Sequence, residues 1–383
     1  MSETLKSWRS RLATDKQYVA GFSSENFILP MFISDSTDEN LVEPISALPG
    51  QFKFGPSAAV EYLRSLVDEY NLRAVILFGV IEEKADKDEI GSLADAIGVT
   101  VSGRDYTNPV ILAMQRMKTT FGNRLLLIAD VCLCSYTSSG HCGIMKAGGS
   151  GGIPNAALSH NRLAEVAVSY ARHGADVIAP SDMIEGRVGP MRKALNATGH
   201  SSIPIMSYAV KYCSAFYGPF RSAVQAKSRG EAKQAPPCCM EESDEKGAAY
   251  IAMRQSMLPS LAQQSEGTYI DRSGYQLHPE TSDSDIERIV NMDVSHGAEY
   301  LLVKPSTCYL DVTHKVAHMV DVPVGVYHTS GEYCQLLYAA QSGALDLSKA
   351  LTEFIVAGRR AGANFVISYF TPFILRELRE RKA

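Results

Sequence analysis

Eight short apolar runs alternate with longer amphipathic segments, and this alternation limits the folds that the chain can adopt. The runs are rich in Val, Ile, Leu and Phe, and they occupy residues 27–33, 73–80, 124–131, 175–180, 203–208, 299–305, 322–327 and 364–369. Runs that are apolar at nearly every position are typical of strands buried on both faces of a parallel sheet. Helices are predicted between them, because apolar residues recur at helical spacing in segments such as 57–70, 159–174, 284–297 and 345–362.

Eight βα units favour an α/β fold, a closed (β/α)8 TIM barrel. An open doubly wound sheet gives a similar pattern and remains the architectural alternative. Polar side chains gather at or just after the ends of six runs, for example Asp130 and Cys132 at the third, Lys304 at the sixth and Tyr369 at the eighth. Such clustering is the arrangement expected at the carboxyl-terminal rim of a barrel enzyme.

The chain is predicted to form one catalytic domain, residues 26–383, after an N-terminal arm of residues 1–25. Trp8 in the arm is expected to be buried against a neighbouring subunit or against the barrel. Residues 226–270, between the fifth and sixth runs, are charged and contain Pro. They are predicted to form an insertion that serves as an extended active-site lid.

Composition argues against several classes of protein. A net charge of -5 with interspersed signs, and a single Trp, provide neither a basic stripe nor a stacking platform, so nucleic acid is not an expected partner. No apolar run approaches a membrane span, and the start of the chain lacks the apolar core of a signal peptide. A cytoplasmic protein without a membrane partner is expected. Eight cysteines in such a chain indicate metal-binding or catalytic thiols rather than disulfides.

Three cysteines in ADVCLCSYTSSGHCGI, residues 129–144, form a candidate metal site. Cys132 and Cys134 face the same way in an extended segment, and the following turn can bring Cys142 back to them. A catalytic zinc site uses three protein ligands and leaves the fourth position to water or substrate. The alternative is three unrelated buried cysteines. Three further cysteines are predicted to be buried packing residues, namely Cys213, Cys308 and Cys334.

Two lysines lie in apolar surroundings, which is unusual for this residue. Lys304 ends the run EYLLVKP, and Lys211 follows the run IPIMSY among aromatic and small residues. Burial beside another cation lowers the pKa of an amine, and a neutral amine can attack a ketone to form a Schiff base. This pair therefore predicts covalent carbonyl chemistry.

Other side chains are candidates for holding carboxylate groups of a substrate. Arg221, Arg272 and Gln276 form the first candidate set, because a guanidinium group can bind a carboxylate through two hydrogen bonds. The hydroxyls of Ser330 and Tyr369 form a second candidate set. His328 is interpreted as a structural histidine at a strand end rather than a base.

Taken together, these segments resemble the porphobilinogen synthase family, also called 5-aminolevulinate dehydratases. The matching stretches are DVCLCSYTSSGHCG, GADVIAPSDMIEGRVG, IMSYAVKYCSAFYGPFR, DRSGYQL, LLVKPSTCYLDV, VYHTSGEY and ISYFTP. The resemblance implies a (β/α)8 barrel that condenses two 5-aminolevulinate molecules to porphobilinogen and assembles as a homo-octamer. It implies Schiff bases at Lys304 and Lys211, one Zn²⁺ held by Cys132, Cys134 and Cys142, and Asp130 as a proton-transfer or orienting group. The substrate-binding residues that it implies are Arg221, Arg272, Gln276, Ser330, Tyr369, Ser181, Asp182, Tyr217 and Phe220.

Departures from the family pattern limit what is carried over. Gly274 stands where some members have a Cys, so a second zinc through His141 loses a partner. The turn near Ile289 lacks the Glu of members with an allosteric magnesium ion, so no such site is expected. Two other functions remain alternatives: a class I aldolase acting on sugar phosphates, and a binding module in which the cysteines hold a structural zinc.

Overall fold

The computed structural model describes residues 5, 6, 8, 10, 23–146, 152–224 and 272–380. Its centre is a closed barrel of eight parallel strands, which coincide with the eight apolar runs. They are β1 (Phe27–Ser34), β4 (Ala74–Val80), β7 (Leu126–Val131), β8 (Val177–Pro180), β9 (Ile205–Lys211), β10 (Ala298–Lys304), β11 (Val324–His328) and β12 (Phe365–Ser368).

The barrel closes because the last strand pairs with the first. Neighbouring strands follow chain order from β1 to β12, and β12 pairs with β1 through Phe27↔Val366 and Ile28↔Ile367. An open doubly wound sheet would leave these two strands as edges. The prediction of a TIM barrel is therefore confirmed, and the open sheet is excluded.

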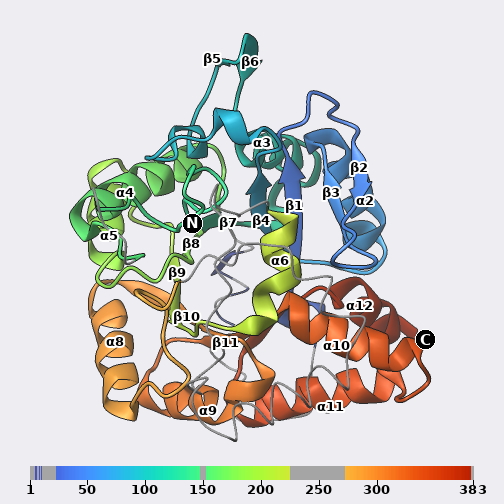
Figure 1. Cartoon of the computed structure of the whole chain (residues 1–383). Helices are drawn as coiled ribbons and strands as arrows, with labels where there is room; N and C mark the ends of the chain where they lie inside the picture. Colours follow the sequence, from blue (N-terminus) through green and yellow to red (C-terminus); the bar gives the residue numbers. More distant parts are fainter. Residues whose placement is uncertain are drawn as a thin grey trace, which may run out of the picture.

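Helices surround the barrel (Figure 1). The described helices are α2 (Pro56–Asp68), α3 (Pro109–Phe121), α4 (Ala156–Arg172), α5 (Val188–Ala197), α6 (Gly218–Ala223), α8 (Asp283–Ser295), α9 (Leu310–Met319), α10 (Ser330–Gln341), α11 (Leu347–Arg360) and α12 (Thr371–Glu380). Side-chain caps begin several of them: Asn155 accepts from Leu158 N at α4, and Ser282 accepts from Asp285 N at α8. Such caps satisfy backbone donors that the first helical turn leaves unpaired.

Alternation along each strand divides the apolar residues into two layers. On β10, Leu301 and Val303 pack outward with the helices, whereas Tyr300 and Leu302 belong to the cluster inside the barrel. The next inward position on this strand is Lys304. Apolar side chains thus fill the lower barrel, and polar groups begin only at its carboxyl-terminal end.

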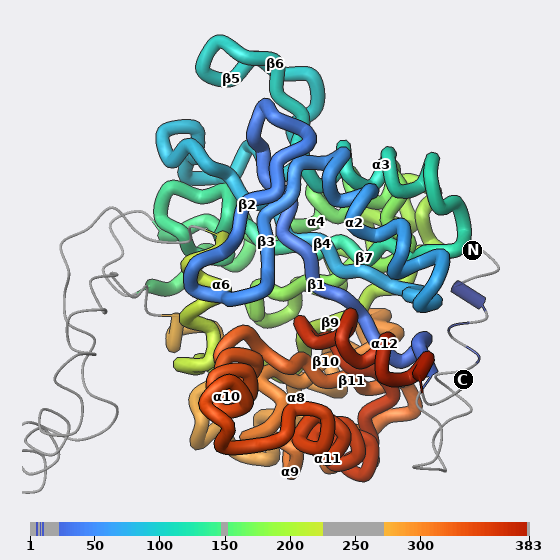
Figure 2. Tube along the Cα trace, turned by 90° about the vertical axis from the view of Figure 1, so that its right-hand side faces the viewer, coloured from blue at the N-terminus to red at the C-terminus, as the bar shows by residue number. Residues whose placement is uncertain are grey.

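Two small hairpins were not predicted from the sequence. β2 (Val42–Pro44) and β3 (Phe52–Phe54) are antiparallel, and β3 also pairs with the end of β1. β5 (Val99–Val101) and β6 (Arg104–Tyr106) form a second hairpin that projects from the barrel (Figure 2). Each of these four strands has only three residues, and three of the four contain charged side chains, so they leave little periodic signal.

Trp8 lies against the barrel rather than in solvent. Its side chain is buried, its indole Nε1 donates to the backbone carbonyl of Glu25 at 2.9 Å, and its ring packs on Tyr300 and Phe365 at centroid distances of 5.0 and 5.8 Å. The predicted lid at 226–270 and the cysteine pair Cys238–Cys239 lie outside the described residues.

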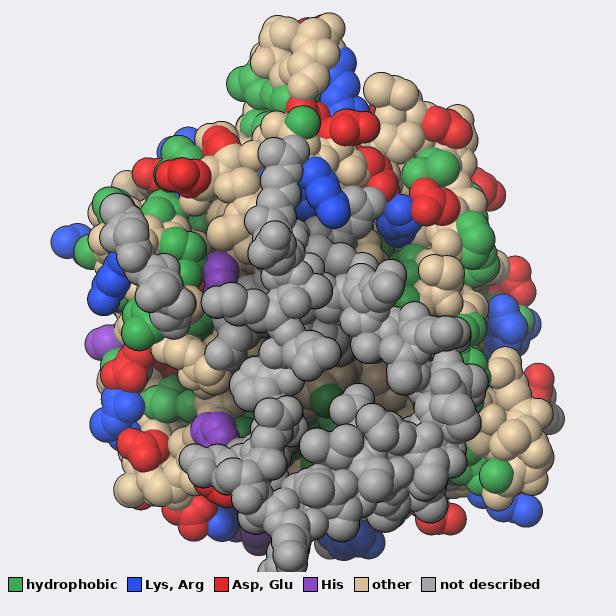
Figure 3. Space-filling view, in the orientation of Figure 1, with side chains coloured by type: hydrophobic (Ala, Val, Ile, Leu, Met, Phe, Trp, Pro, Cys, Tyr) green, Lys and Arg blue, Asp and Glu red, His purple; other side chains and the backbone are tan. Residues whose placement is uncertain are grey.

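The visible surface carries charges of both signs, interspersed around the rim (Figure 3). This distribution agrees with the small net charge of -5. Within the described part of the chain, every helix is too short or too polar to cross a membrane.

Candidate active site

The inward positions of the strands deliver the predicted catalytic groups to one end of the barrel. On β7, Leu126 and Ile128 lie in the interior cluster, so Asp130 and then Cys132 continue the same row. On β10 the corresponding row ends at Lys304, and β9 ends at Lys211. Because parallel strands end on the same side, these groups meet at the barrel mouth.

Lys304 is enclosed by aromatic rings. Its Nζ lies 4.1 Å from the ring centroid of Tyr327, 5.0 Å from Phe220, 5.1 Å from Tyr217 and 5.4 Å from Tyr208. Burial, followed by repulsion from Lys211, lowers the pKa of Lys304 to about 7. A substantial fraction of this amine is therefore neutral near neutral pH, as a nucleophile requires.

Lys211 occupies the neighbouring position and is also buried. Its Nζ donates to the backbone carbonyl of Ser181 at 2.5 Å and lies 5.8 Å from the centroid of the Tyr208 ring. Tyr208 thus lies within 6 Å of both amines. The hydrogen bond to Ser181 fixes the direction of the Lys211 side chain.

Asp130 is an acid that interacts electrostatically with both lysines. Burial raises its pKa to about 7, while a hydrogen bond from Ser181 and the charges of Lys211 and Lys304 act in the opposite direction. Its Oδ1 atom is buried and has no hydrogen-bond partner among the described residues. A carboxyl group with this pKa can both donate and accept a proton near neutrality.

The three predicted cysteines come together as a buried cluster. The Sγ atoms of Cys132, Cys134 and Cys142 all lie within 4.8 Å of one another. Tetrahedral zinc with Zn–S bonds of about 2.3 Å places sulfur atoms about 3.8 Å apart, so the cluster fits this ion with small adjustments. Hydrogen bonds from the other two thiols lower the pKa of Cys142, and the same two neighbours raise the pKa of Cys132.

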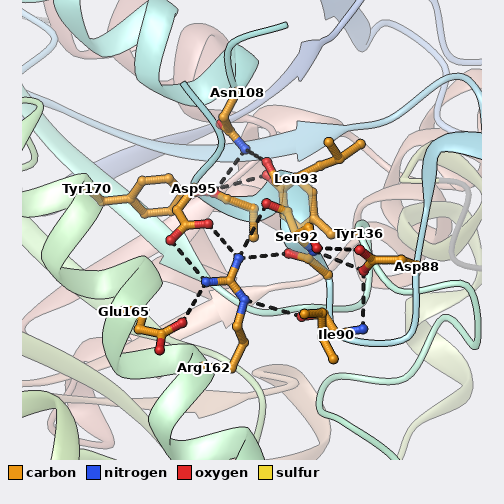
Figure 4. Close-up of polar contacts among 12 residues, drawn as sticks. Asp88, Ile90, Ser92, Leu93, Asp95, Asn108, Tyr136, Arg162, Glu165 and Tyr170 are labelled. Carbon is orange, nitrogen blue, oxygen red and sulfur yellow. Dashed lines mark hydrogen bonds and ion pairs between the residues drawn. The ribbon is translucent and has the colours of Figure 1, made fainter. Parts of the chain in front are cut away.

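Arg162, on helix α4, holds the segment 88–95 through several polar contacts (Figure 4). The Arg162 guanidinium donates to the backbone carbonyls of Ile90 and Gly91 at 3.3 and 3.0 Å and pairs with Asp95. The same segment holds the cysteine turn, because Ser138 N donates to the carbonyl of Asp88 at 2.8 Å. This support could not be predicted from motifs, since it depends on which loops become neighbours.

A cavity opens between the amines and the cysteines. It is lined by Cys134, Cys142, Lys211, Tyr217, Phe220, Arg221, Val224, Arg272, Gln276 and Lys304. The Arg272 Nη2 atom donates to the carbonyl of Gly140 at 2.8 Å, and the thiolates raise the pKa of Arg272, which keeps it cationic. The predicted groups for carboxylate binding, Arg221, Arg272 and Gln276, therefore face the same space as both lysines.

Two predicted substrate-binding hydroxyls do not line this cavity. Ser330 Oγ accepts from Phe220 N at 3.0 Å and donates to the carbonyl of Phe216 at 3.3 Å, which ties α6 to α10. The Tyr369 hydroxyl accepts from Tyr327 at 3.3 Å. Both hydroxyls lie close to the cavity but are occupied by protein partners.

Asp182 does not line this cavity either. Its Oδ1 accepts from Ile184 N at 2.7 Å, and its Oδ2 lies 3.6 Å from Arg187 Nε. Both carboxylate oxygens thus face protein groups, and substrate binding by Asp182 stays a prediction. Arg187 itself was missed by the sequence reasoning, because one arginine in a short turn carries no signal that separates it from a surface residue.

Among the described residues, the remaining cysteines and histidines do not line the cavity. Cys334 is buried as predicted, but Cys308 is exposed and Cys213 only partly buried, so the prediction was wrong for these two. His328 is buried and its Nδ1 contacts Ser368 Oγ at 3.1 Å, which agrees with a structural role. His141 Nδ1 lies 3.2 Å from the Tyr275 hydroxyl, and that hydroxyl also accepts from Cys142 N at 3.3 Å.

Known proteins match this chain over nearly its whole length. A family model described as delta-aminolevulinic acid dehydratase matches residues 6–253 and 260–377. The enzyme of that name from Macaca fascicularis is 37% identical over 378 residues, which cover 98% of this chain and 95% of the relative. The corresponding protein of Bos taurus is 39% identical over 360 residues, covering 94% and 92%.

A solved structure agrees with these matches. Delta-aminolevulinic acid dehydratase (porphobilinogen synthase) from Toxoplasma gondii ME49, in complex with the reaction product porphobilinogen, superposes with a TM-score of 0.75. It is 28% identical, and the match covers 93% of this chain and 85% of that one.

Proposed function

The chain belongs to the delta-aminolevulinic acid dehydratase family and is a lyase of that family, and we propose that Lys304, Lys211 and the cysteine cluster carry out its reaction. Two molecules of 5-aminolevulinate condense and lose two molecules of water to give porphobilinogen. The observation that carries this assignment is Lys304, an amine held in an aromatic enclosure with a pKa of about 7.

The first step is attack by the neutral Lys304 amine on the keto carbon of one substrate molecule. A C=N bond forms, the keto oxygen leaves as water, and Lys304 becomes part of a Schiff base. Asp130 is assigned the role of passing protons in this step, because its pKa of about 7 is close to that of the amine. The aromatic rings around Nζ exclude bulk water, which would otherwise hydrolyse the adduct.

Two different lysine environments can distinguish two identical keto acids. Lys304 lies among four aromatic rings, whereas Lys211 is near only one of them, Tyr208, and is tied to the Ser181 carbonyl. A Schiff base at each would hold the two substrates in different orientations, which converts a bimolecular condensation into a reaction within one site. Release of the product regenerates both amines.

Separate carboxylate sites would complete this asymmetry. Arg221, Arg272 and Gln276 line the cavity and are assigned to the substrate bound at Lys211. Ser330 and Tyr369 are assigned to the substrate at Lys304. The second assignment is supported by contacts with Phe220, whose ring lies 5.0 Å from Lys304 Nζ. Ser330 binds the Phe220 backbone, and Tyr369 stacks on Phe32, which packs against the Phe220 ring at 5.7 Å.

Zinc is the proposed resident metal, held by Cys132, Cys134 and Cys142. When bound, it supplies a Lewis acid that polarises an oxygen of the substrate. The soft thiolate set favours Zn²⁺ over Mg²⁺, which prefers oxygen ligands. A homo-octamer and a cytoplasmic location are part of the proposal on the ground of family membership.

Porphobilinogen formation with and without a chelator tests the function. Product should form with zinc present and disappear when the metal is removed. Borohydride added together with 5-aminolevulinate should trap an adduct on Lys304. An aldolase without a metal would keep full activity after chelation, and that result would overturn the zinc assignment.

A further inference from the structure

The two strands that carry Ser181 and Lys211 separate towards the barrel mouth. β8 and β9 are paired at a single position, Ile178↔Ile205, near the start of each strand. β7 and β8, by contrast, stay paired as far as Val131↔Pro180. Main-chain pairing therefore does not fix the distance between Ser181 and Lys211 at the site.

Arg187 fills the opening between these strands with a completely buried guanidinium. Its Nη2 atom donates to the Ser207 hydroxyl at 3.0 Å and to the Tyr208 carbonyl at 3.1 Å, both on β9. Its Nη1 donates to Asp293 Oδ2 on α8 at 3.2 Å, and its Nε lies 3.6 Å from Asp182 Oδ2 just beyond β8. One side chain thus joins β8, β9 and α8.

The turn that carries Ser181 is strained and depends on such support. Met183 has a φ of 71°, a left-handed conformation that is unfavourable for a residue with a Cβ and persists only where its surroundings fix it. Asp182 bridges this turn, because Oδ1 accepts from Ile184 N and Oδ2 faces Arg187. Loss of the guanidinium would free the turn to relax.

The network around Arg187 fixes the positions of two groups near the lysines, the Ser181 carbonyl and Tyr208. The Ser181 carbonyl accepts from Lys211 Nζ at 2.5 Å, and Tyr208, whose carbonyl Arg187 holds, lies within 6 Å of both amines. We infer that Arg187 is a positioning residue, which holds Ser181 and Tyr208 in register and thereby directs the Lys211 amine into the cavity. The inference rests on the proposed function, since it concerns the lysine assigned to the second substrate.

The competing interpretation is that Arg187 serves stability alone, as a buried ion pair with two carboxylates. The two interpretations differ in what remains after a mild substitution. If Arg187 is purely structural, its substitution should lower every activity of the site in proportion to the loss of folded protein. If Arg187 positions Lys211, its substitution should impair turnover, while adduct formation at Lys304 on the next strand survives.

The test compares Arg187→Lys with Arg192→Lys in the full-length, zinc-loaded enzyme. Lysine keeps the charge but cannot reach Ser207, Tyr208 and Asp293 at once. Arg192 is the matched control, on helix α5, which begins directly after Arg187. It donates to the carbonyls of Ile203 and Gly297 at 3.0 and 3.3 Å, at the opposite end of the barrel. Turnover, the borohydride-trapped adduct on Lys304 and the folded fraction by circular dichroism are measured for each.

For Arg187→Lys we expect kcat per folded enzyme to fall about 10- to 100-fold, the cost of a small misplacement of a reacting group, with the Lys304 adduct retained. Arg192→Lys should keep both the wild-type kcat and the Lys304 adduct. Unchanged turnover in Arg187→Lys, or turnover and adduct that fall together, would overturn the inference. If Arg187→Lys does not fold, Ser207→Ala, which removes one hydroxyl from the same network, must show the selective loss. A wild-type enzyme that formed neither product nor adduct would instead contradict the proposed function.

Discussion

Replacing Lys304 by Met should abolish product formation and also make the protein more stable, by an amount that depends on pH. The pKa of this lysine falls from 10.5 to about 7 on folding, mainly through burial. At about 1.36 kcal/mol per pH unit, holding the protonated amine in the folded state costs roughly 5 kcal/mol below pH 7. Between the two pKa values the unfolded state binds more protons, so the cost declines as pH rises, to roughly 2 kcal/mol at pH 9.

Urea unfolding of the wild type and of Lys304→Met at several pH values measures this cost. The variant should be the more stable protein at pH 6, and its advantage should shrink by about 3 kcal/mol by pH 9. Lys349→Met is the control, since the Lys349 side chain is 81% exposed and its substitution should show no such trend. Stability curves of wild type and Lys304→Met that run parallel between pH 6 and 9 would refute a lowered pKa at this amine.

Other substitutions test the rest of the site. Cys142→Ser should weaken zinc binding by at least about tenfold, measured by competition with a coloured chelator, because one of three thiolate ligands is lost. Arg272→Met should raise the KM for 5-aminolevulinate more than it changes the amount of Lys304 adduct, since Arg272 is assigned to the carboxylate of the other substrate; an unchanged KM would contradict that role. Trp8→Ala should lower the unfolding free energy by about 3–5 kcal/mol, the usual result of removing a buried Trp, without altering the pH profile of adduct formation.

The barrel was predictable because its strands are buried on both faces. A strand such as Ala74–Val80 is apolar throughout, and no surface element would tolerate such a run. The cysteine cluster was also predictable, since alternate residues of one segment face the same side and a single turn returns Cys142. In both cases the information is local in sequence.

Contacts between segments far apart in the chain were not predictable. The Ser330 hydroxyl was expected to bind substrate, and no motif indicated that it would also join α6 to α10 through Phe220 N and the Phe216 carbonyl. Asp182 faces Arg187 because the turn after β8 is left-handed at Met183, and no residue in that turn signals this conformation. Likewise, Cys308 was expected to be buried from its apolar neighbours, yet it lies in a short 3-10 turn (Thr307–Tyr309) where its side chain is exposed.

The side chains that fill the interior of the barrel also make Lys304 reactive. Tyr208, Tyr327 and Leu302 fill the layer beneath the amine, and their burial is what stabilises a closed barrel. The same side chains exclude water from Nζ, and exclusion of water is the largest cause of the lowered pKa. The barrel therefore cannot pack its upper interior tightly without making a lysine at the end of β10 a better nucleophile. Any interior substitution that admits water should raise the pKa of Lys304 and slow Schiff-base formation at neutral pH, even where it leaves every polar group of the site unchanged.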